Sequence, residues 1–225
     1  EVKPYPAIAL GSFEATPLEM AAAYNVLANG GIKVSPTTVL SVVDERNATL
    51  EQNVSAPPRV ARPESTFLVV NMMRGVINNG TAAAVRTMGF SADAAGKTGT
   101  TNDLRDAWFA GFTADLLCVV WVGFDDNTPT GLSGSKAAVP IWVDFMKGAQ
   151  AGANGQKLAT PAANIVFVKV DRATGLLATP YCPTTIDEAF VAERCDLASF
   201  RSWREWVAWR RNSRPSPWIG PNQSR

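Results

Sequence analysis

Residues 95–101 read Ala-Gly-Lys-Thr-Gly-Thr-Thr, and residues 106–124 read Asp-Ala-Trp-Phe-Ala-Gly-Phe-Thr-Ala-Asp-Leu-Leu-Cys-Val-Val-Trp-Val-Gly-Phe. The second segment is almost continuously apolar and is interrupted at Ala114-Asp115, so it predicts two antiparallel strands joined by a turn. Strands of this composition are typical of a sheet that is covered on both faces. We therefore expect a strand that carries Lys97 to lead into a buried hairpin.

Capping residues and helical periodicity predict three helices. Residues 16–19, Thr-Pro-Leu-Glu, form a capping box with Pro at the first helical position, and the helix that begins there is expected to stop at Gly30-Gly31. Residues 63–79 place apolar side chains at helical spacing and predict a second helix. Residues 139–150 predict a third, amphipathic helix that packs on the sheet.

The remaining segments predict shorter elements and connections. Residues 39–43 suggest a short strand, whereas residues 50–62 are polar, contain Pro and are interpreted as a surface loop. Residues 151–161 predict a linker of small residues. Residues 165–170 predict a strand that ends in an Asp-Arg-Ala-Thr-Gly turn.

Length and composition limit the domain organisation. A chain of 225 residues can bury one good core plus an appendage. We expect a main domain over residues 1–150, a linker and small extension over 151–198, and a basic tail over 199–225. The chain begins with Glu1 rather than Met, so we expect it to be a piece of a longer protein. No run approaches the ~18 apolar residues of a membrane helix.

The composition also excludes several kinds of site. The chain contains no His, which removes Ser-His-Asp and Cys-His catalysis and His-based metal sites within it. We expect no cofactor and no metal. The formal net charge of +1 gives no general indication of nucleic-acid binding. Cys118 is expected to be a buried thiol, whereas Cys182 and Cys195 are a candidate disulfide pair that would fit an oxidising compartment.

The last part of the chain differs in charge from the rest. From Ser199 onward there are six arginines and one glutamate, a net charge of +5, which leaves −4 for the preceding part. A short helix there would gather Trp203, Trp206 and Trp209 on one side. Such a helix would either pack its indoles on its own domain or contact an anionic membrane, a wall polymer or a protein partner.

The residues around Lys97 suit the chemistry of acyl transfer. The ammonium of Lys97 would supply positive potential to neighbouring groups, and the hydroxyls of Thr98 and Thr100 could bind a substrate carboxylate. Gly99 lets an extended peptide or a lactam ring lie against the strand. The backbone N–H of Thr100 could point at a developing oxyanion. Taken alone, the motif also fits a Thr-rich surface strand with a solvated lysine.

Two other interpretations of these motifs fit worse. A phosphate-binding loop would need a Gly at position 91, which is Ser91, and a helix where Gly99 follows Lys97. Residues 133–136, Ser-Gly-Ser-Lys, match the letters S-x-x-K, in which a lysine one helical turn on activates a serine. They lie in a Gly-rich loop and follow the Lys97 motif, so we interpret them as coincidental loop residues.

The Lys97 motif resembles the third active-site motif of penicillin-binding proteins. Other segments are similar to the second half of the transpeptidase domains of the class A family. Together they span residues 5 to 148 in the family's order: Tyr-Pro-Ala-Ile-Ala-Leu-Gly-Ser-Phe-Glu-Ala-Thr-Pro-Leu-Glu-Met-Ala-Ala-Ala-Tyr at 5–24, Ala-Asn-Gly-Gly at 28–31, Asp-Ala-Trp-Phe-Ala-Gly at 106–111, Val-Trp-Val-Gly-Phe-Asp-Asp at 120–126 and Ala-Val-Pro-Ile-Trp-Val-Asp-Phe-Met at 138–146.

This resemblance implies an α+β, penicilloyl-serine-transferase fold in which helices flank an antiparallel sheet, incomplete at its N-terminal side. It implies D,D-transpeptidation of peptidoglycan stem peptides through an acyl-serine that β-lactams also form. Lys97, Thr98, Gly99 and Thr100 carry over as catalytic residues, with Thr98, Thr100 and Thr101 as substrate-binding residues. The nucleophilic serine, the S-x-N loop and a membrane anchor are expected upstream of residue 1, and the protein is expected at the extracytoplasmic face of the bacterial inner membrane.

Two alternatives stay open on the sequence. A non-catalytic module could keep the fold and bind wall peptides or partners, and a Ser and Lys three residues apart on an upstream helix would favour the enzyme instead. A β-lactamase fits less well, because transpeptidase-like segments flank the motif on both sides. In each case we expect the isolated chain to form no acyl-enzyme.

Overall fold

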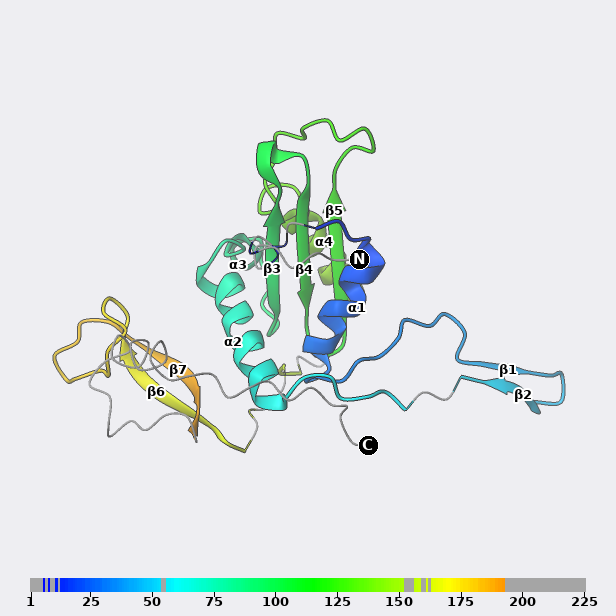
Figure 1. Cartoon of the computed structure of the whole chain (residues 1–225), viewed down its shortest axis with the longest axis horizontal. Helices are drawn as coiled ribbons and strands as arrows, with labels where there is room; N and C mark the ends of the chain where they lie inside the picture. Colours follow the sequence, from blue (N-terminus) through cyan, green and yellow to red (C-terminus); the bar gives the residue numbers. More distant parts are fainter. Residues whose placement is uncertain are drawn as a thin grey trace. The chain divides into compact units, whose positions relative to one another are not determined.

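A three-stranded antiparallel sheet organises the computed structural model, which describes residues 6, 8, 11, 13–53, 56–151, 156–158, 161 and 163–192 (Figure 1). Its strands are β3 (Ala95–Thr100), β4 (Ala107–Phe112) and β5 (Leu117–Val122), in the order β3-β4-β5. The predicted strand at Lys97 and the predicted apolar hairpin are therefore confirmed. The tail from Ser199 and Cys195 lie outside the described residues.

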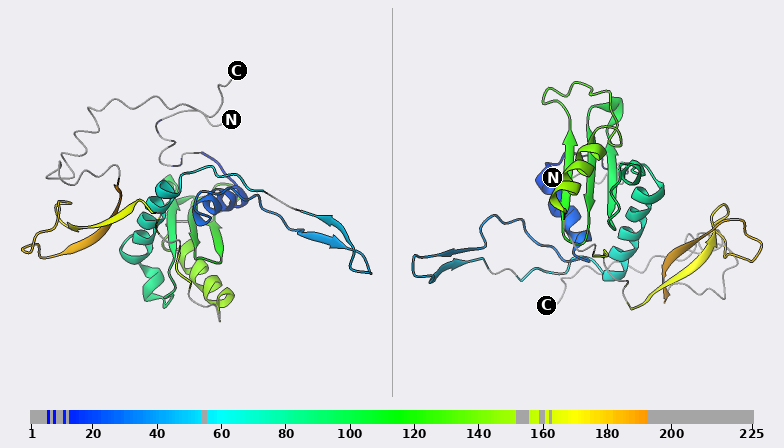
Figure 2. Two further views of the ribbon diagram at one scale, coloured as in Figure 1. Left: turned by 90° about the horizontal axis from the view of Figure 1, so that it is seen from below. Right: turned by 180° about the vertical axis from the view of Figure 1, so that it is seen from behind.

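Helices lie on both faces of this sheet. Figure 1 and Figure 2 show α1 (Pro17–Ala28) on one face and α4 (Ala138–Ala149) on the other. The capping box of α1 is present, since Thr16 Oγ1 accepts from the Glu19 N–H and the Glu19 carboxylate accepts from the Thr16 N–H. Both predicted helices are confirmed, and so is the expectation that the sheet is covered on both faces.

The helix α2 (Pro63–Asn79) has the predicted bounds and contributes to both sides of the sheet. Its Val70 and Met73 join the cluster on the α1 side, where Ala95 and Phe112 are buried. Its Ile77 joins the cluster on the α4 side, together with residues of the short helix α3 (Ala84–Thr87). Because one helix enters both clusters, α2 anchors the beginning of β3 to the core.

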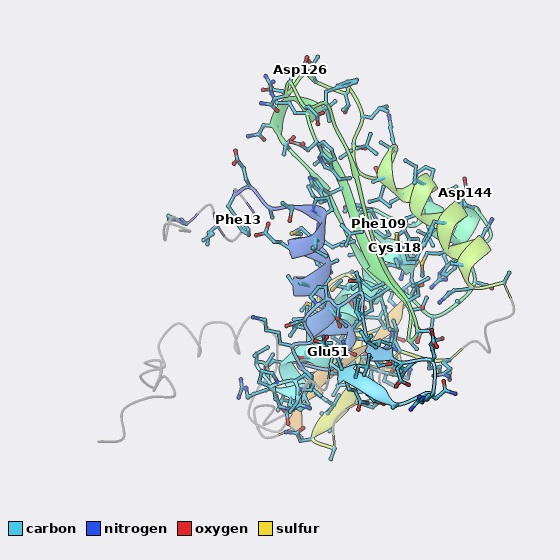
Figure 3. The ribbon with its side chains drawn as sticks, turned by 90° about the vertical axis from the view of Figure 1, so that its right-hand side faces the viewer. Phe13, Glu51, Phe109, Cys118, Asp126 and Asp144 are labelled. Carbon is cyan, nitrogen blue, oxygen red and sulfur yellow. The ribbon has the colours of Figure 1, made fainter. Side chains whose placement is uncertain are left out.

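The largest buried side chain, Trp142 of α4, packs against the sheet. Its ring makes edge contacts with Phe90 and Phe109, each with ring centroids 5.2 Å apart. Its indole N–H donates to the Gly111 carbonyl at 3.2 Å. Figure 3 shows Phe109 within the sheet layer and Asp144 on the outer side of α4. The amphipathic pattern of α4 thus buries its apolar face against the sheet, as predicted.

The segment between α1 and α2 differs from the prediction. The strand β1 (Ser41–Val43) lies within the expected strand, but residues 50–62 are not all loop, because β2 (Thr49–Gln52) pairs antiparallel with β1. All seven residues of the two strands are exposed. A hairpin held by backbone hydrogen bonds without a buried face leaves no hydrophobic alternation in the sequence, which explains why β2 was not predicted.

The expected linker over residues 151–161 also contains an anchored residue. Leu158 is only 4% exposed and packs with Val70 and Met73. Arg74 donates to the Leu158 carbonyl at 2.8 Å, and the Leu158 N–H donates to Asp93 at 3.0 Å. Interpreting the whole segment as a linker was therefore wrong at this position, because one leucine among small residues produces no periodic signal.

The chain divides into two units between Ala162 and Ala163, and the described part of the second contains the hairpin of β6 (Ile165–Asp171) and β7 (Thr185–Val191). The strand and turn predicted at 165–175 are confirmed, whereas β7 was not predicted. The carboxylate of Asp171 accepts from the Thr174 N–H at 2.8 Å and from its hydroxyl at 2.9 Å. These hydrogen bonds, led by the one from the Thr174 backbone, lower the pKa of Asp171.

The predictions of a buried thiol, of a candidate disulfide and of no membrane helix concern the cysteines and the helix lengths. Cys118 lies half-buried in β5, and its burial raises the pKa of the thiol. The sulfur of Cys182 lies 3.4 Å from the Thr179 hydroxyl, and Cys195, its partner in the candidate disulfide, is outside the described residues, so the disulfide stays a prediction. Among the described helices, none combines the length and the apolar character that crossing a bilayer requires.

Candidate active-site strand

The motif residues Lys97 to Thr100 lie on a strand with one free edge. In the described part of the chain, β3 pairs only with β4, in a register that places Lys97 opposite Ala110 and Thr98 opposite Phe109. The first two residues of β3 are buried, whereas Lys97 and Thr100 are exposed. The core therefore covers the beginning of the strand and leaves the motif accessible.

Along β3, the N–H and C=O groups of successive residues point alternately to β4 and to the free edge. The Thr101 N–H donates to the Asp106 carbonyl at 3.1 Å, so these two residues form a hydrogen-bonded pair of the antiparallel ladder. Because such pairs alternate with pairs that are not hydrogen-bonded, Gly99 also directs its backbone groups to β4. The N–H and C=O groups of Thr98 and Thr100 then point to the free edge. The Thr100 N–H is thus available to a ligand that lies along β3.

The side chains of the motif divide between the two faces of the sheet. Ala95 packs in the cluster on the α1 side, and side chains in a strand alternate, so Lys97 projects to that face. Thr98 and Thr100 project to the α4 face. The ammonium of Lys97 nevertheless reaches the free edge, where it donates to the Thr98 carbonyl at 2.7 Å. The free edge therefore carries a positive charge beside a backbone N–H that pairs with no other described residue.

Both threonine hydroxyls are held from the α4 side. The Thr98 hydroxyl lies 2.7 Å from that of Thr81, which follows α2. The Thr100 hydroxyl accepts from the Gly134 N–H at 3.0 Å. An oxygen that accepts from the protein keeps its own proton to donate elsewhere. The Thr100 hydroxyl is therefore oriented as a donor, which suits an anionic ligand.

The loop that supports Thr100 approaches the sheet very closely. A Cβ atom at Gly134 would lie 2.4 Å from the carbonyl oxygens of both Gly99 and Trp108. Glycine is needed here for this contact, since Gly134 is not among the residues with positive φ. Gly99 also leaves room on the other face, where a Cβ would meet that of Trp108 at 3.0 Å. At Gly99 the strand therefore carries no side chain on the α1 face, and the loop at Gly134 supports it on the α4 face.

Thr101 occupies a different position from the one expected for a substrate-binding residue. Its hydroxyl accepts from the Asp106 N–H at 2.7 Å and donates to the Asp106 carboxylate at 3.1 Å. Its side chain projects to the opposite face from those of Thr98 and Thr100. The hydroxyl is already both donor and acceptor within the protein, so Thr101 supports the end of β3 instead of lining its free edge.

The two competing motifs do not form sites. Lys97 lies in the middle of β3, whereas a phosphate-binding loop would require a helix to begin there. The Ser133 hydroxyl lies 2.9 Å from that of Ser135, in the turn before α4. The Ser133 carbonyl accepts from the N–H groups of Lys136 and Ala137, each at 2.9 Å, so these residues form a helical turn that leads into α4 instead of the expected loop. The Lys136 side chain is exposed, and the Ser133 hydroxyl contacts Ser135, so the geometry does not favour activation of Ser133 by Lys136.

A cavity of about 290 Å³ lies apart from the motif. It is bounded by the loop before β3, the β4–β5 turn and the end of α4, and its lining includes Phe90, Asp115 and Lys147. No residue of the motif lines it. Within the described ranges, no group of three or more His, Cys, Asp or Glu residues is placed to hold a metal ion. Among the described residues, the candidate site is therefore an open strand edge and not an enclosed cavity.

Sequence reasoning did not identify several residues that shape this strand. Thr81, Gly134 and Asp106 each hold a motif residue, yet only Asp106 lies within a few positions of its partner. The segment from Thr101 to Asp106 has the length of a tight strand connection, which could have indicated a contact between these two residues. Thr81 and Gly134 are 17 and 34 positions from their partners, so no local pattern could have revealed them.

Comparison with known proteins places this geometry in context. Residues 5–147 match the family model described as the penicillin binding protein transpeptidase domain. Residues 161–194 match the model described as penicillin-binding protein 1A, C-terminal domain. Penicillin-binding protein 1A of Aquifex aeolicus (strain VF5) is 40% identical over 183 residues, which cover 80% of this chain and 25% of that protein.

Solved structures show the same likeness. The crystal structure of penicillin-binding protein 1A from Haemophilus influenzae matches with a TM-score of 0.73 and 31% identity, covering 83% of this chain and 33% of that one. The penicillin-binding protein PonA1 from Mycobacterium tuberculosis matches with a TM-score of 0.61 and 27% identity, covering 71% of this chain and 44% of that one. The chain thus spans a quarter of the length of the Aquifex aeolicus protein and less than half of each matched structure.

Proposed function

This chain belongs to the family of penicillin-binding protein transpeptidase domains, and on that premise we propose that it completes the active site of a serine-type peptidoglycan D,D-transpeptidase. The structural likeness confirms the predicted α+β, penicilloyl-serine-transferase fold. One observation supports the proposal above all others. Lys97, Thr98 and Thr100 lie on a strand edge that the described chain leaves free.

We propose a role for each motif residue from its position. The Lys97 ammonium at the free edge would hold a neighbouring nucleophile or general acid in its reactive protonation state. The hydroxyl of Thr100, oriented as a donor by Gly134, would bind a substrate carboxylate together with Thr98. Gly99 would let the extended stem peptide lie flat on the strand.

The Thr100 N–H would stabilise the reaction's intermediate. A serine from the part of the protein outside this chain would attack the stem-peptide carbonyl, and the carbonyl oxygen would become an oxyanion. A fixed backbone donor aimed at that oxygen lowers the barrier, because the donor is already oriented before charge develops. The terminal residue would leave as an amine, and an acceptor amine of a second stem peptide would then release the serine. β-Lactams would acylate the same serine.

This reaction sets the location that we propose for the protein. Peptidoglycan cross-linking takes place outside the cytoplasm, so the domain would face the cell wall at the inner membrane, attached through an anchor outside this chain. The basic tail from Ser199 would contact the membrane, a wall polymer or a protein partner there. Comparing the liposome binding of the full protein with that of a version shortened at Ser199 would test the membrane contact, and equal binding would exclude it.

Penicillin labelling of the full-length protein tests the proposed function. We expect Lys97→Ala to lower the rate of covalent labelling at least about 100-fold, as expected for the loss of a charged group from an active site. Lys33→Ala is the matched control, because Lys33 is exposed and lies outside the sheet, and it should label like the wild type. Normal labelling of Lys97→Ala would contradict the proposed role.

The isolated chain provides a second test of the same proposal. Residues 1–225 alone should not be labelled, because the nucleophile is proposed to lie outside them, and covalent labelling of this polypeptide would contradict that placement. A full-length wild type that binds stem peptides without ever being acylated would instead identify the non-catalytic module. Labelling of the isolated chain would thus show that the nucleophile was misplaced, whereas a wild type that is never acylated would show that the proposed activity is wrong.

A further inference from the structure

Asp106 lies just before β4 and makes hydrogen bonds to both neighbouring strands of the sheet. Its carboxylate accepts from the Thr101 hydroxyl, at the end of β3, at 3.1 Å. It also accepts from the indole N–H of Trp121, in β5, at 2.9 Å. Its own N–H donates to the Thr101 hydroxyl at 2.7 Å. One side chain therefore ties all three strands together at the end of the sheet that carries the motif.

The turn that Asp106 closes is unfavourable on its own. Asp103 and Leu104 have φ values of 60° and 55°, in the left-handed region that non-glycine residues rarely adopt. External hydrogen bonds hold this turn, including one from the Thr130 hydroxyl to the Leu104 carbonyl at 2.8 Å. Contacts around the turn must therefore maintain its shape, and the Thr101–Asp106 pair closes its base.

This pair lies immediately beside the proposed oxyanion donor. The peptide plane between Thr100 and Thr101 carries the Thr100 C=O and the Thr101 N–H, and the Thr101 N–H donates to the Asp106 carbonyl at 3.1 Å, so the Thr100 C=O points to the free edge. The Thr100 N–H lies in the preceding peptide plane, which is linked to this one through the φ and ψ angles of Thr100. Gly134 fixes the Thr100 hydroxyl from the other side. Loosening Thr101 would free the Thr100–Thr101 peptide plane and, through the φ and ψ angles of Thr100, the direction of the Thr100 N–H.

We propose that Asp106 is a positioning residue for acylation, which acts through Thr101 to hold the Thr100 N–H in the direction that an oxyanion requires. The inference rests on the proposed function, because it takes Thr100 as the oxyanion donor. Asp106 itself touches neither substrate nor nucleophile in this assignment. Trp121 has a supporting role, since its indole N–H holds the carboxylate from the third strand.

The test uses the full-length protein and separates binding from chemistry. Stopped-flow acylation by a chromogenic β-lactam gives the dissociation constant of the initial complex and the rate of the acylation step. We expect Asp106→Ala to slow the acylation step about 10- to 100-fold, the loss expected when a catalytic group is displaced by a fraction of an ångström to about an ångström. The dissociation constant should change less than about threefold, because the carboxylate-binding hydroxyls stay in place.

Matched variants distinguish positioning from stability. Thr101→Val removes only the hydroxyl at nearly constant shape and should reproduce the slow acylation, whereas Thr101→Ser keeps the hydroxyl and should restore the wild-type rate. If Asp106→Ala does not fold, this pair carries the test. Asp144→Ala, on the exposed outer side of α4, is the acidic control and should acylate normally (Figure 3).

The possible outcomes have separate meanings. An unchanged acylation step in both Asp106→Ala and Thr101→Val would overturn the positioning role while leaving the proposed function intact. If Asp106→Ala lowered β-lactam affinity and melting temperature together with the acylation rate, and Thr101→Ser also acylated slowly, Asp106 would have a structural role only. That result would also overturn the positioning role. A wild type that is never acylated would refute the proposed function first.

Discussion

Replacing Gly134 with alanine tests how the loop before α4 supports the proposed active-site strand. The added Cβ atom would lie 2.4 Å from the carbonyl oxygens of both Gly99 and Trp108. Both are backbone atoms of paired strands, so neither can move aside as a flexible side chain would. The loop must therefore shift away from the sheet, and the hydrogen bond from the Gly134 N–H to the Thr100 hydroxyl would lengthen or break.

The size of this effect follows from the geometry. Overpacking a close contact by one methyl group costs about 1–3 kcal/mol when the surroundings are backbone. For a domain of 150–250 residues, each kcal/mol corresponds to about 2–4 °C in melting temperature, so Gly134→Ala should melt about 2–12 °C lower. The acylation step should also slow, because the Thr100 hydroxyl would no longer be oriented as a donor.

Gly148→Ala is the matched control for this substitution. Gly148 lies in α4 with no atom within 4 Å of its added Cβ, so alanine there should raise the free energy of unfolding by about 0.5–1 kcal/mol. Melting is followed by tryptophan fluorescence in the full-length protein, since Trp108 and Trp121 lie on the sheet. If Gly134→Ala melted and acylated like the wild type, the close support of Thr100 by this loop would be refuted.

Two further predictions concern stability. Arg74→Met should lower the free energy of unfolding by about 1.5–3 kcal/mol, because it leaves Asp93 and the Leu158 carbonyl without their charged donor. Arg74→Lys should recover only part of this free energy, because lysine cannot make the bidentate contact with Asp93. Denaturant unfolding measures both variants, and full stability of Arg74→Met would contradict the anchoring of Leu158. The pKa of Asp171 is lowered in the folded state. The stabilisation that Asp171 gives to the second unit is therefore present above the ordinary carboxyl pKa of about 4 and is lost as pH falls through the lowered value. Thermal melts from pH 7 to pH 2 should show this loss in the wild type and a flatter profile in Asp171→Asn, and identical profiles would exclude the contribution.

Local patterns predicted the elements that bury one apolar face. The helix α2 has the predicted bounds because its buried residues recur at helical spacing between Pro63 and the Asn79-Gly80 end. The β4–β5 hairpin was predicted because both strands are apolar around a short polar break. The strand β2 was missed for the opposite reason, since it buries no face and its pairing is made by backbone groups that every residue carries.

The candidate site shows a similar division. The motif at Lys97 and the resemblance of the flanking segments identified the strand, and the comparisons confirm the family. Thr101 was placed with the substrate-binding residues because of its neighbours, whereas its hydroxyl donates to the Asp106 carboxylate and accepts from the Asp106 N–H.

The amino-acid sequence by itself determined the helices α1, α2 and α4, the strands of the central sheet and which strand carries the reactive groups, because those properties depend on residues that are near one another in the chain. Only the tertiary structure decided that β3 pairs with β4 alone among the described strands, and that Thr81 and Gly134 hold the two threonine hydroxyls. The physical reason is that a hydrogen bond between distant residues depends on how the chain packs, and it leaves no periodic pattern in either partner's surroundings.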